Sequence, residues 1–174
     1  MNAGIGLITE DRRGNGIFGC LSIKDNVGVS IYNKYLNAGF VLNHKKINEI
    51  VTSSIKKLSI KTPSMKEHIS NLSGGNQQKV IVARWLANDP DVLIMDEPTR
   101  GIDVGAKHEI YEIMCDLAKQ GKAIIMISSE MSELLGMSDR ICVMCNGKLT
   151  GEVKEPEDMT QAKNYGIRNK ILMR

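Results

Sequence analysis

The sequence predicts an α/β fold in which a parallel sheet is joined to a mainly helical segment. Residues 92–95 and 123–127 are continuous apolar runs, typical of strands that are buried on both faces. An amphipathic helix is expected between them, and Gly121 is its predicted stop. The apolar face of this helix consists of Ile110, Ile113, Met114, Leu117 and Ala118. Strand, helix and strand in this order form a βαβ crossover, which makes the two strands parallel.

A glycine-rich loop follows the first predicted strand end, residues 5–9. Gly14, Gly16 and Gly19 spell G-x-G-x-x-G, which binds dinucleotides when it joins the strand and helix of a βαβ unit. That motif also needs an acidic residue about 20 positions further on, and none stands there. We therefore interpret residues 10–19 as a flexible loop.

Residues 22–88 predict the helical segment. Ser22 and Asp25 form a capping-box pattern, in which both side chains satisfy free backbone amides. Apolar residues at helical spacing predict a helix over 47–58. Another helix is expected after Ser73, whose hydroxyl is a candidate N-cap.

The C-terminal part predicts a hairpin over 141–153, because Asn146–Gly147 stands between two alternating runs. The polar tail after Pro156 predicts a loose helix. Cys142 and Cys145 form a C-x-x-C pair, but residues three apart on a strand point to opposite faces. We interpret them as reduced, buried thiols and expect no zinc site.

The composition excludes several classes of protein. With 174 residues, 42% of them hydrophobic and 25% charged, the chain has the balance of a globular domain. A net charge of +3 and an aromatic content of 4% argue against nucleic acid as a partner. No apolar run approaches the ~20 residues that span a bilayer, and the first residues do not form a secretory signal. We therefore expect a cytoplasmic protein.

Residues 72–79, LSGGNQQK, are the most informative stretch. The two glycines, Gly74 and Gly75, let the backbone approach a ligand closely. Free amides and the positive end of the helix dipole would then point at one spot, which suits phosphate oxygens. Taken alone, this stretch is better explained as a serine N-cap after a glycine turn.

Residues 92–97, VLIMDE, are the second informative stretch. They bring Asp96 and Glu97 to the carboxyl end of a parallel strand, where open α/β sheets bind ligands. An aspartate there can hold Mg²⁺, and the glutamate can orient or deprotonate a water molecule. Alone, such a strand is about as often just a strand that enters a turn.

In combination, these stretches resemble the ATP-binding cassette (ABC) family. Residues 72–79 are similar to its signature motif, residues 92–98 to its Walker B strand, and residues 98–107 to its D-loop and following helix. The NQQK and TRGID spellings resemble the second, C-terminal cassette of ribose, galactose and xylose importers. The resemblance implies part of a P-loop NTPase fold with a parallel sheet and an inserted helical subdomain. The expected division is 1–21 for the Q-loop strand and loop, 22–88 for the helical subdomain, 89–154 for the distal catalytic core and 155–174 for a tail.

In this family two cassettes meet head to tail around ATP. The resemblance assigns the signature residues to the ATP that the partner cassette holds: Ser73, Gly74, Gly75 and Asn76. Many members carry glutamine where this chain has Asn76. The resemblance also implies that Asp96 serves Mg²⁺, that Glu97 is catalytic towards the hydrolytic water, and that Asp103 lies at the seam between cassettes.

Two positions depart from the family pattern. Glu10 stands where the Q-loop glutamine is expected, and Ser129 stands where the switch histidine is expected. Glu10 could still ligate Mg²⁺ but adds negative charge, and Ser129 could bind phosphate but lacks imidazolium charge. We therefore expect slow hydrolysis at this nucleotide site.

The 174 residues contain no G-x-x-x-x-G-K-[ST] segment, the Walker A loop that cradles phosphates. We expect that the chain begins near the Q-loop and that it is inactive alone. We also expect strands beside 92–95 to be missing, which would leave that strand at an open edge.

The resemblance implies the ATP-binding subunit of a sugar importer, at the inner face of the plasma membrane. Its partners would be a second cassette, the transmembrane permease and, indirectly, a sugar-binding protein. The alternative is a non-catalytic fragment that only donates residues 73–75 to a partner. A cassette protein of DNA repair or translation is disfavoured by the TRGID spelling and by the missing basic patch.

Overall fold

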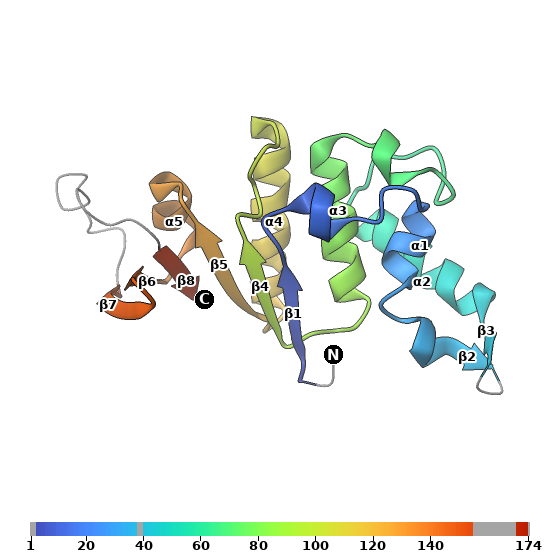
Figure 1. Ribbon diagram of the computed structural model, residues 1–174, viewed down its shortest axis with the longest axis horizontal. Coiled ribbons are helices and arrows are strands. Elements are labelled where there is room, and N and C mark those ends of the chain that lie inside the picture. The colour runs from blue at the N-terminus through green and yellow to red at the C-terminus, as the bar shows by residue number, and fades with distance from the viewer. Residues whose placement is uncertain (1–2, 38–39, 155–169, 174) are drawn as a thin grey trace.

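The computed structural model describes residues 3–37, 40–154 and 170–173. A six-stranded sheet runs through the molecule in the order β1-β4-β5-β8-β6-β7 (Figure 1). Its strands are β1 (Ile5–Ile8), β4 (Val92–Asp96), β5 (Ala123–Ser128), β6 (Arg140–Cys145), β7 (Lys148–Val153) and β8 (Lys170–Met173). The first three of the spatial order, β1, β4 and β5, pair in parallel, and the other pairings are antiparallel. The carboxyl ends of β1, β4 and β5 therefore meet at one edge of the sheet.

The helices divide into two groups. In the helical segment, which lies beyond β1 in Figure 1, are α1 (Ile23–Gly28), α2 (His44–Lys57), α3 (Gly74–Leu86) and a small hairpin of β2 (Leu36–Asn37) and β3 (Val41–Leu42). The sheet part carries α4 (Val104–Lys119) and α5 (Met131–Met137). Short helical turns occupy Arg12–Gly16, Tyr32–Tyr35 and Ile69–Asn71.

Helix α3 joins the two parts of the molecule. Its residues 77–84 are all buried, and it contacts α1, α2, α4 and β1. A side chain at Gly6 on β1 would begin 3.0 Å from Leu93 Cδ1 and 3.3 Å from Trp85 Cε3. Glycine at this position thus lets α3 lie directly against the sheet, and one hydrophobic cluster extends from the helical segment to Ile141 of β6.

The α/β class and the parallel crossover are confirmed. The pairing of β4 with β5 is parallel, and α4 lies between them in sequence with Gly121 just beyond it at φ +84°. The hairpin prediction is also confirmed, because Asn146 and Gly147 take φ values of 49° and 75° between β6 and β7. Both positive angles are those of a type I′ turn.

Several expectations about the sheet were wrong. Strand β4 is not at an edge, because β1 and β5 flank it, and only Leu93 and Met95 of its apolar run are fully buried. The small β2–β3 hairpin was not expected within residues 22–88. Most of the tail after Pro156 lies outside the described residues, but Lys170–Met173 forms strand β8 and not a helix.

In the described part of the chain, no helix is both long enough and apolar enough to cross a membrane. Cys142 and Cys145 are both free thiols, but only Cys142 is buried. The expectation of a buried thiol was wrong for Cys145, which is the last residue of β6 and is exposed.

Candidate functional site

The N-terminus of α3 is built differently from the predicted serine cap. Ser73 occupies the N-cap position but makes no capping hydrogen bond with its side chain. Instead, Asn76 Nδ2 donates to Ser73 Oγ over 2.9 Å, while Asn76 Oδ1 accepts from the backbone N–H of Lys61 over 2.8 Å. The side chain of Asn76 therefore holds the Ser73 oxygen, and the exposed hydroxyl can still donate its hydrogen to a ligand.

The glycines of this turn permit close packing against the start of α4. A Cβ atom at Gly75 would lie 2.4 Å from the Cβ of Ala106. A Cβ at Gly74 would lie 3.1 Å from Arg12 Nη2 and 3.4 Å from the carbonyl oxygen of Gly101. The turn formed by residues 73–75, the signature turn, thus packs closely against residues 100–106, which follow Asp96 and Glu97 in the sequence.

Asp103 begins α4 as its N-cap residue, and its Oδ1 accepts from the N–H of Ala106 over 2.8 Å. The negative charge of this carboxylate also interacts favourably with the positive end of the α4 helix dipole. This contact fixes the loop that runs past the signature turn.

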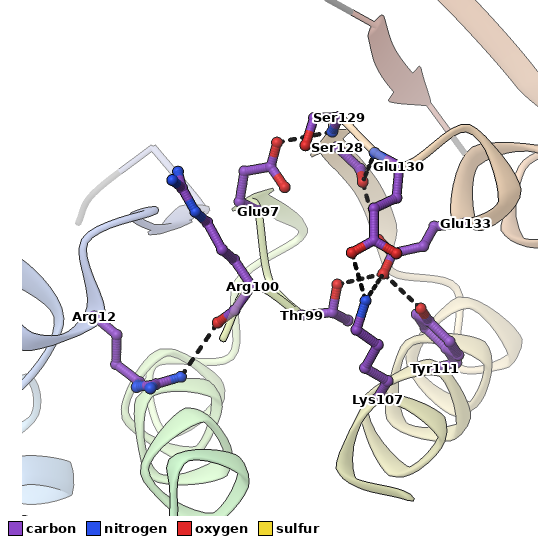
Figure 2. Close-up of polar contacts among 10 residues, drawn as sticks. All are labelled: Arg12, Glu97, Thr99, Arg100, Lys107, Tyr111, Ser128, Ser129, Glu130 and Glu133. Carbon is purple, nitrogen blue, oxygen red and sulfur yellow. Dashed lines mark hydrogen bonds and ion pairs between the residues drawn. The ribbon is translucent and has the colours of Figure 1, made fainter. Parts of the chain in front are cut away.

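Asp96 and Glu97 stand where β4 ends, and Asp96 pairs in register with Ile127 of β5. Glu97 has a φ of 45°, a left-handed conformation that is uncommon for a residue with a side chain. Its N–H donates to the carbonyl oxygen of Ile127 over 2.9 Å, and its Oε1 accepts from the backbone N–H of Ser129 over 2.7 Å (Figure 2). The carboxylate of the predicted general base is thereby oriented by the chain that leaves β5.

Ser129, predicted at the switch position, contributes through its backbone. Within the described residues its hydroxyl makes no hydrogen bond, and the residue is exposed. The structure brings Glu97 and Ser129 together through the backbone amide of Ser129 and not through its side chain.

Glu10 follows β1, whose pairing with β4 ends at Ile8 and Met95. Its carboxylate forms an ion pair with Arg100. Arg12 Nη1 also donates to the Arg100 carbonyl oxygen over 3.5 Å, as Figure 2 shows. Together with Asp11 and Arg13, these residues line an open cleft. The negative charge of Glu10 is thus compensated by a residue that the sequence did not single out.

A buried carboxylate behind this edge was missed by the sequence analysis. Glu133 of α5 accepts hydrogen bonds from Thr99 Oγ1 at 2.5 Å, Tyr111 OH at 2.7 Å, Ser128 Oγ at 2.9 Å and Lys107 Nζ at 3.1 Å (Figure 2). The only local indication was an i, i+4 pair of polar groups on α4, Lys107 and Tyr111. Their common partner lies on another helix, so the sequence spacing does not reveal it.

Electrostatics support an ionised Glu133. Burial raises the pKa of this carboxyl, but the hydrogen bonds from Thr99, Tyr111, Ser128 and Lys107 outweigh burial and bring its pKa below the ordinary value. Burial and the bond to Glu133 raise the pKa of Tyr111 to about 12, so the phenol remains a donor at neutral pH.

The donor set at the end of β4 suits Mg²⁺. Asp96 and Glu97 are both half-buried, so their carboxylates remain partly accessible to solvent. Mg²⁺ is commonly held by one or two carboxylates while phosphate oxygens and water complete its shell. These residues fit that requirement without a dedicated protein cage.

Taken together, a parallel sheet with acids at its carboxyl edge and a glycine-rich helix N-terminus beside it correspond to part of the P-loop NTPase fold. The profile of the family described as "ABC transporter" matches residues 1–100, and the chain belongs to this family. Among solved structures, cbiO1 from Clostridium perfringens, described as part of the ABC transporter complex cbiONQ, superposes with a TM-score of 0.73 at 25% identity, over 90% of this chain and 59% of the other. The ATP-binding cassette MJ0796, in a dimeric post-hydrolysis state bound to ADP and Pi, has the same fold, with a TM-score of 0.72 at 22% identity. The superposition covers 86% of this chain and 62% of the MJ0796 chain.

Curated relatives are more similar in sequence. The galactose/methyl galactoside import ATP-binding protein MglA of Clostridium tetani is 60% identical over 91% of this chain and 31% of its own length. The ribose import ATP-binding protein RbsA of Oceanobacillus iheyensis is 51% identical over 94% of this chain and 32% of its own length. The chain thus spans about a third of the length of these relatives.

Proposed function

We propose that this chain is the distal part of an ATP-hydrolysing cassette that powers the uptake of a monosaccharide. The observation that carries the proposal is the placement of Glu97, whose carboxylate is fixed at the carboxyl edge of a parallel sheet by the Ser129 amide at 2.7 Å. Relatives named as sugar import ATP-binding proteins support the same activity.

The proposed roles follow the contacts of each residue. Glu97 would act as general base towards the hydrolytic water. Asp96 would hold Mg²⁺, with Glu10 and Ser129 also at this nucleotide, and the ion would neutralise phosphate charge when bound. The signature residues would contact the ATP of the partner cassette (Ser73, Gly74, Gly75 and Asn76), and Asp103 would lie at the interface between cassettes.

We further propose that the chain represents the second cassette of its transporter. The NQQK and TRGID spellings support this assignment. Because the 174 residues contain no Walker A segment, the amide cradle for the phosphates must come from residues other than these. The 174-residue chain alone is therefore expected to bind ATP weakly and to be inactive.

The partners proposed are a second cassette, the transmembrane permease and, indirectly, a sugar-binding protein, with this chain at the cytoplasmic face of the plasma membrane. The helical segment 22–88 would face the permease. Its hairpin supports such a contact, because Phe40 is 80% exposed and Val41 is 52% exposed.

A second candidate is a chain that only donates its signature residues to a partner. It is favoured by one observation, that Ser129 offers no imidazole where the family carries its switch histidine. In this case the nucleotide at Asp96 and Glu97 would bind but not turn over.

The test is ATP hydrolysis by the complete transporter in lipid vesicles, with sugar-loaded binding protein present. We expect Glu97→Gln to remove the turnover that this site contributes, by about 100-fold or more. The matched control is Glu112→Gln, an exposed acid on α4 whose loss should leave turnover unchanged. Full activity in Glu97→Gln together with inactivity in Gly74→Asp would reject hydrolysis here and favour the signature donor.

A further inference from the structure

Two short segments position Glu97, and each of them is hydrogen-bonded to the same buried residue, Glu133. The first segment is Ser128–Glu130, which supplies the Ser129 amide. The second is Pro98–Thr99, which follows Glu97 directly. Glu133, with only 3% of its side chain exposed, accepts a hydrogen bond from each segment.

The first segment is fixed on both sides of Ser129. The hydroxyl of Ser128 donates to Glu133 Oε2 over 2.9 Å and accepts from the N–H of Glu130 over 3.0 Å. These two bonds define the turn in which the Ser129 N–H points to Glu97 Oε1 (Figure 2).

The second segment fixes the backbone of Glu97 itself. Glu97 is in the left-handed region at φ 45°, and a residue with a side chain stays there only where its surroundings enforce it. The buried Thr99, two residues on, donates to Glu133 Oε1 over 2.5 Å. The N–H of Glu97 donates to the carbonyl oxygen of Ile127. The segment from Glu97 to Thr99 is therefore fixed by a hydrogen bond at each end.

A carboxylate is needed at position 133 because each of the four groups bonded to its oxygens donates a hydrogen bond. Four groups donate to its two oxygens, and an amide of the same size has one oxygen and an NH₂ that is itself a donor. Lys107 balances the charge and also pairs with Glu130 at 2.5 Å, which links α4 to the same turn.

We infer that Glu133 is a positioning residue for hydrolysis: through Ser128 and Thr99 it sets the orientation of the Glu97 carboxylate. This role rests on the proposed function of Glu97. A merely structural role for Glu133 predicts lower stability only, whereas the positioning role predicts a lower turnover rate in protein that is folded and binds ATP normally.

The experiment uses the complete ATPase assembled with its permease, with kcat and KM for MgATP as readouts. We expect Glu133→Gln and Ser128→Ala each to lower the kcat of this site by about 10- to 100-fold, the range typical of a misplaced catalytic group. The KM should change by less than about twofold, because neither residue is proposed to contact the nucleotide. Hydrogen exchange of the peptide over 127–131 should become faster in both variants.

The control is Leu117→Ala, a buried position at the far end of α4 from Lys107. It should lower the melting temperature while kcat stays at the parental value. Ser128→Ala removes only one oxygen, so it keeps the test open if Glu133→Gln does not fold.

Unchanged kcat in a folded Glu133→Gln or Ser128→Ala protein would overturn the inference, provided that Glu97→Gln removes activity in the same preparation. Equal losses in Leu117→Ala and Glu133→Gln at matched stability would also overturn it. If Glu97→Gln itself retains activity, the proposed function fails first.

Discussion

The contact between Gly75 and Ala106 yields a prediction whose magnitude follows from the structure. In Gly75→Ala the new Cβ would lie 2.4 Å from the Cβ of Ala106, far inside van der Waals contact. Overpacking of this kind costs about 1–3 kcal/mol, and alanine regains at most about 1 kcal/mol of helix propensity. We therefore expect a net loss of up to about 2 kcal/mol in the free energy of unfolding, as α3 moves away from α4.

The assay is urea unfolding of the 174-residue chain, followed by the fluorescence of Trp85, its single tryptophan, which lies on α3. Ala106→Gly removes the opposing methyl group. If the collision causes the loss, the double variant is more stable than the sum of the single effects predicts, by about 1–3 kcal/mol. The matched control is Gly136→Ala on α5, where a Cβ meets nothing within 4 Å, so no loss is expected.

Additivity of Gly75→Ala and Ala106→Gly within about 0.5 kcal/mol would refute this reasoning. It would mean that the helices do not approach each other as closely as the side-chain contact requires. The glycine at position 75 would then be explained by close approach of a ligand to the signature turn and not by packing against α4.

Three further predictions concern single residues. Ser129→Ala keeps the amide that binds Glu97, so the ATPase rate of the complete transporter should stay within about twofold, whereas Ser129→Pro removes the N–H and should lower the rate by about tenfold or more; a large loss in the alanine variant would contradict this. Arg84 donates to Gly16 O at 2.7 Å and to two Asn26 oxygens at 2.6 and 2.8 Å, so Arg84→Leu should cost about 2–5 kcal/mol in urea unfolding, and Arg84→Lys should recover only part of it. The hydrogen bond from Ser22 lowers the pKa of Asp25 below 3.8, so its contribution to stability is complete above that pH and is lost as the pH falls through the folded-state pKa; Asp25→Asn should flatten the acid limb of a stability–pH curve, and an unchanged limb would argue against it.

Local patterns were sufficient to predict the centre of the fold. The apolar runs at β4 and β5, the helical spacing of α4 and the Asn146–Gly147 turn each specify an element through neighbours in sequence. The Ser22 half of the capping box was also found, since Ser22 Oγ accepts from the Asp25 N–H at 3.1 Å. The other half was wrong, because the Asp25 carboxylate accepts from the Ser22 hydroxyl at 2.6 Å and not from a backbone amide.

Long-range pairing could not be predicted in the same way. In the sequence, β6 and β7 come between β5 and β8, yet in the sheet β8 pairs with both β5 and β6. Its position therefore depends on strand edges that form elsewhere in the chain. The network around Glu133 has the same origin, because its donors come from the β4–α4 loop, α4 and β5. Each of these residues looks ordinary in the sequence, and only the parallel register of β4 and β5 brings them together.

The two departures from the family pattern have different consequences. Glu10 was expected to add repulsion beside phosphate, but its ion pair with Arg100 compensates that charge, so it gives no reason for slow hydrolysis. Ser129 supplies the amide contact to Glu97, so the proposed general base is still oriented. Of these two departures, only Ser129 removes a charge from the proposed site, the imidazolium, which would act on the transition state and not on the position of Glu97. If the complete transporter hydrolyses ATP slowly at this site, we therefore attribute the effect of Ser129 to the missing cation near the phosphate and not to loss of the support that Glu133 gives to the proposed base.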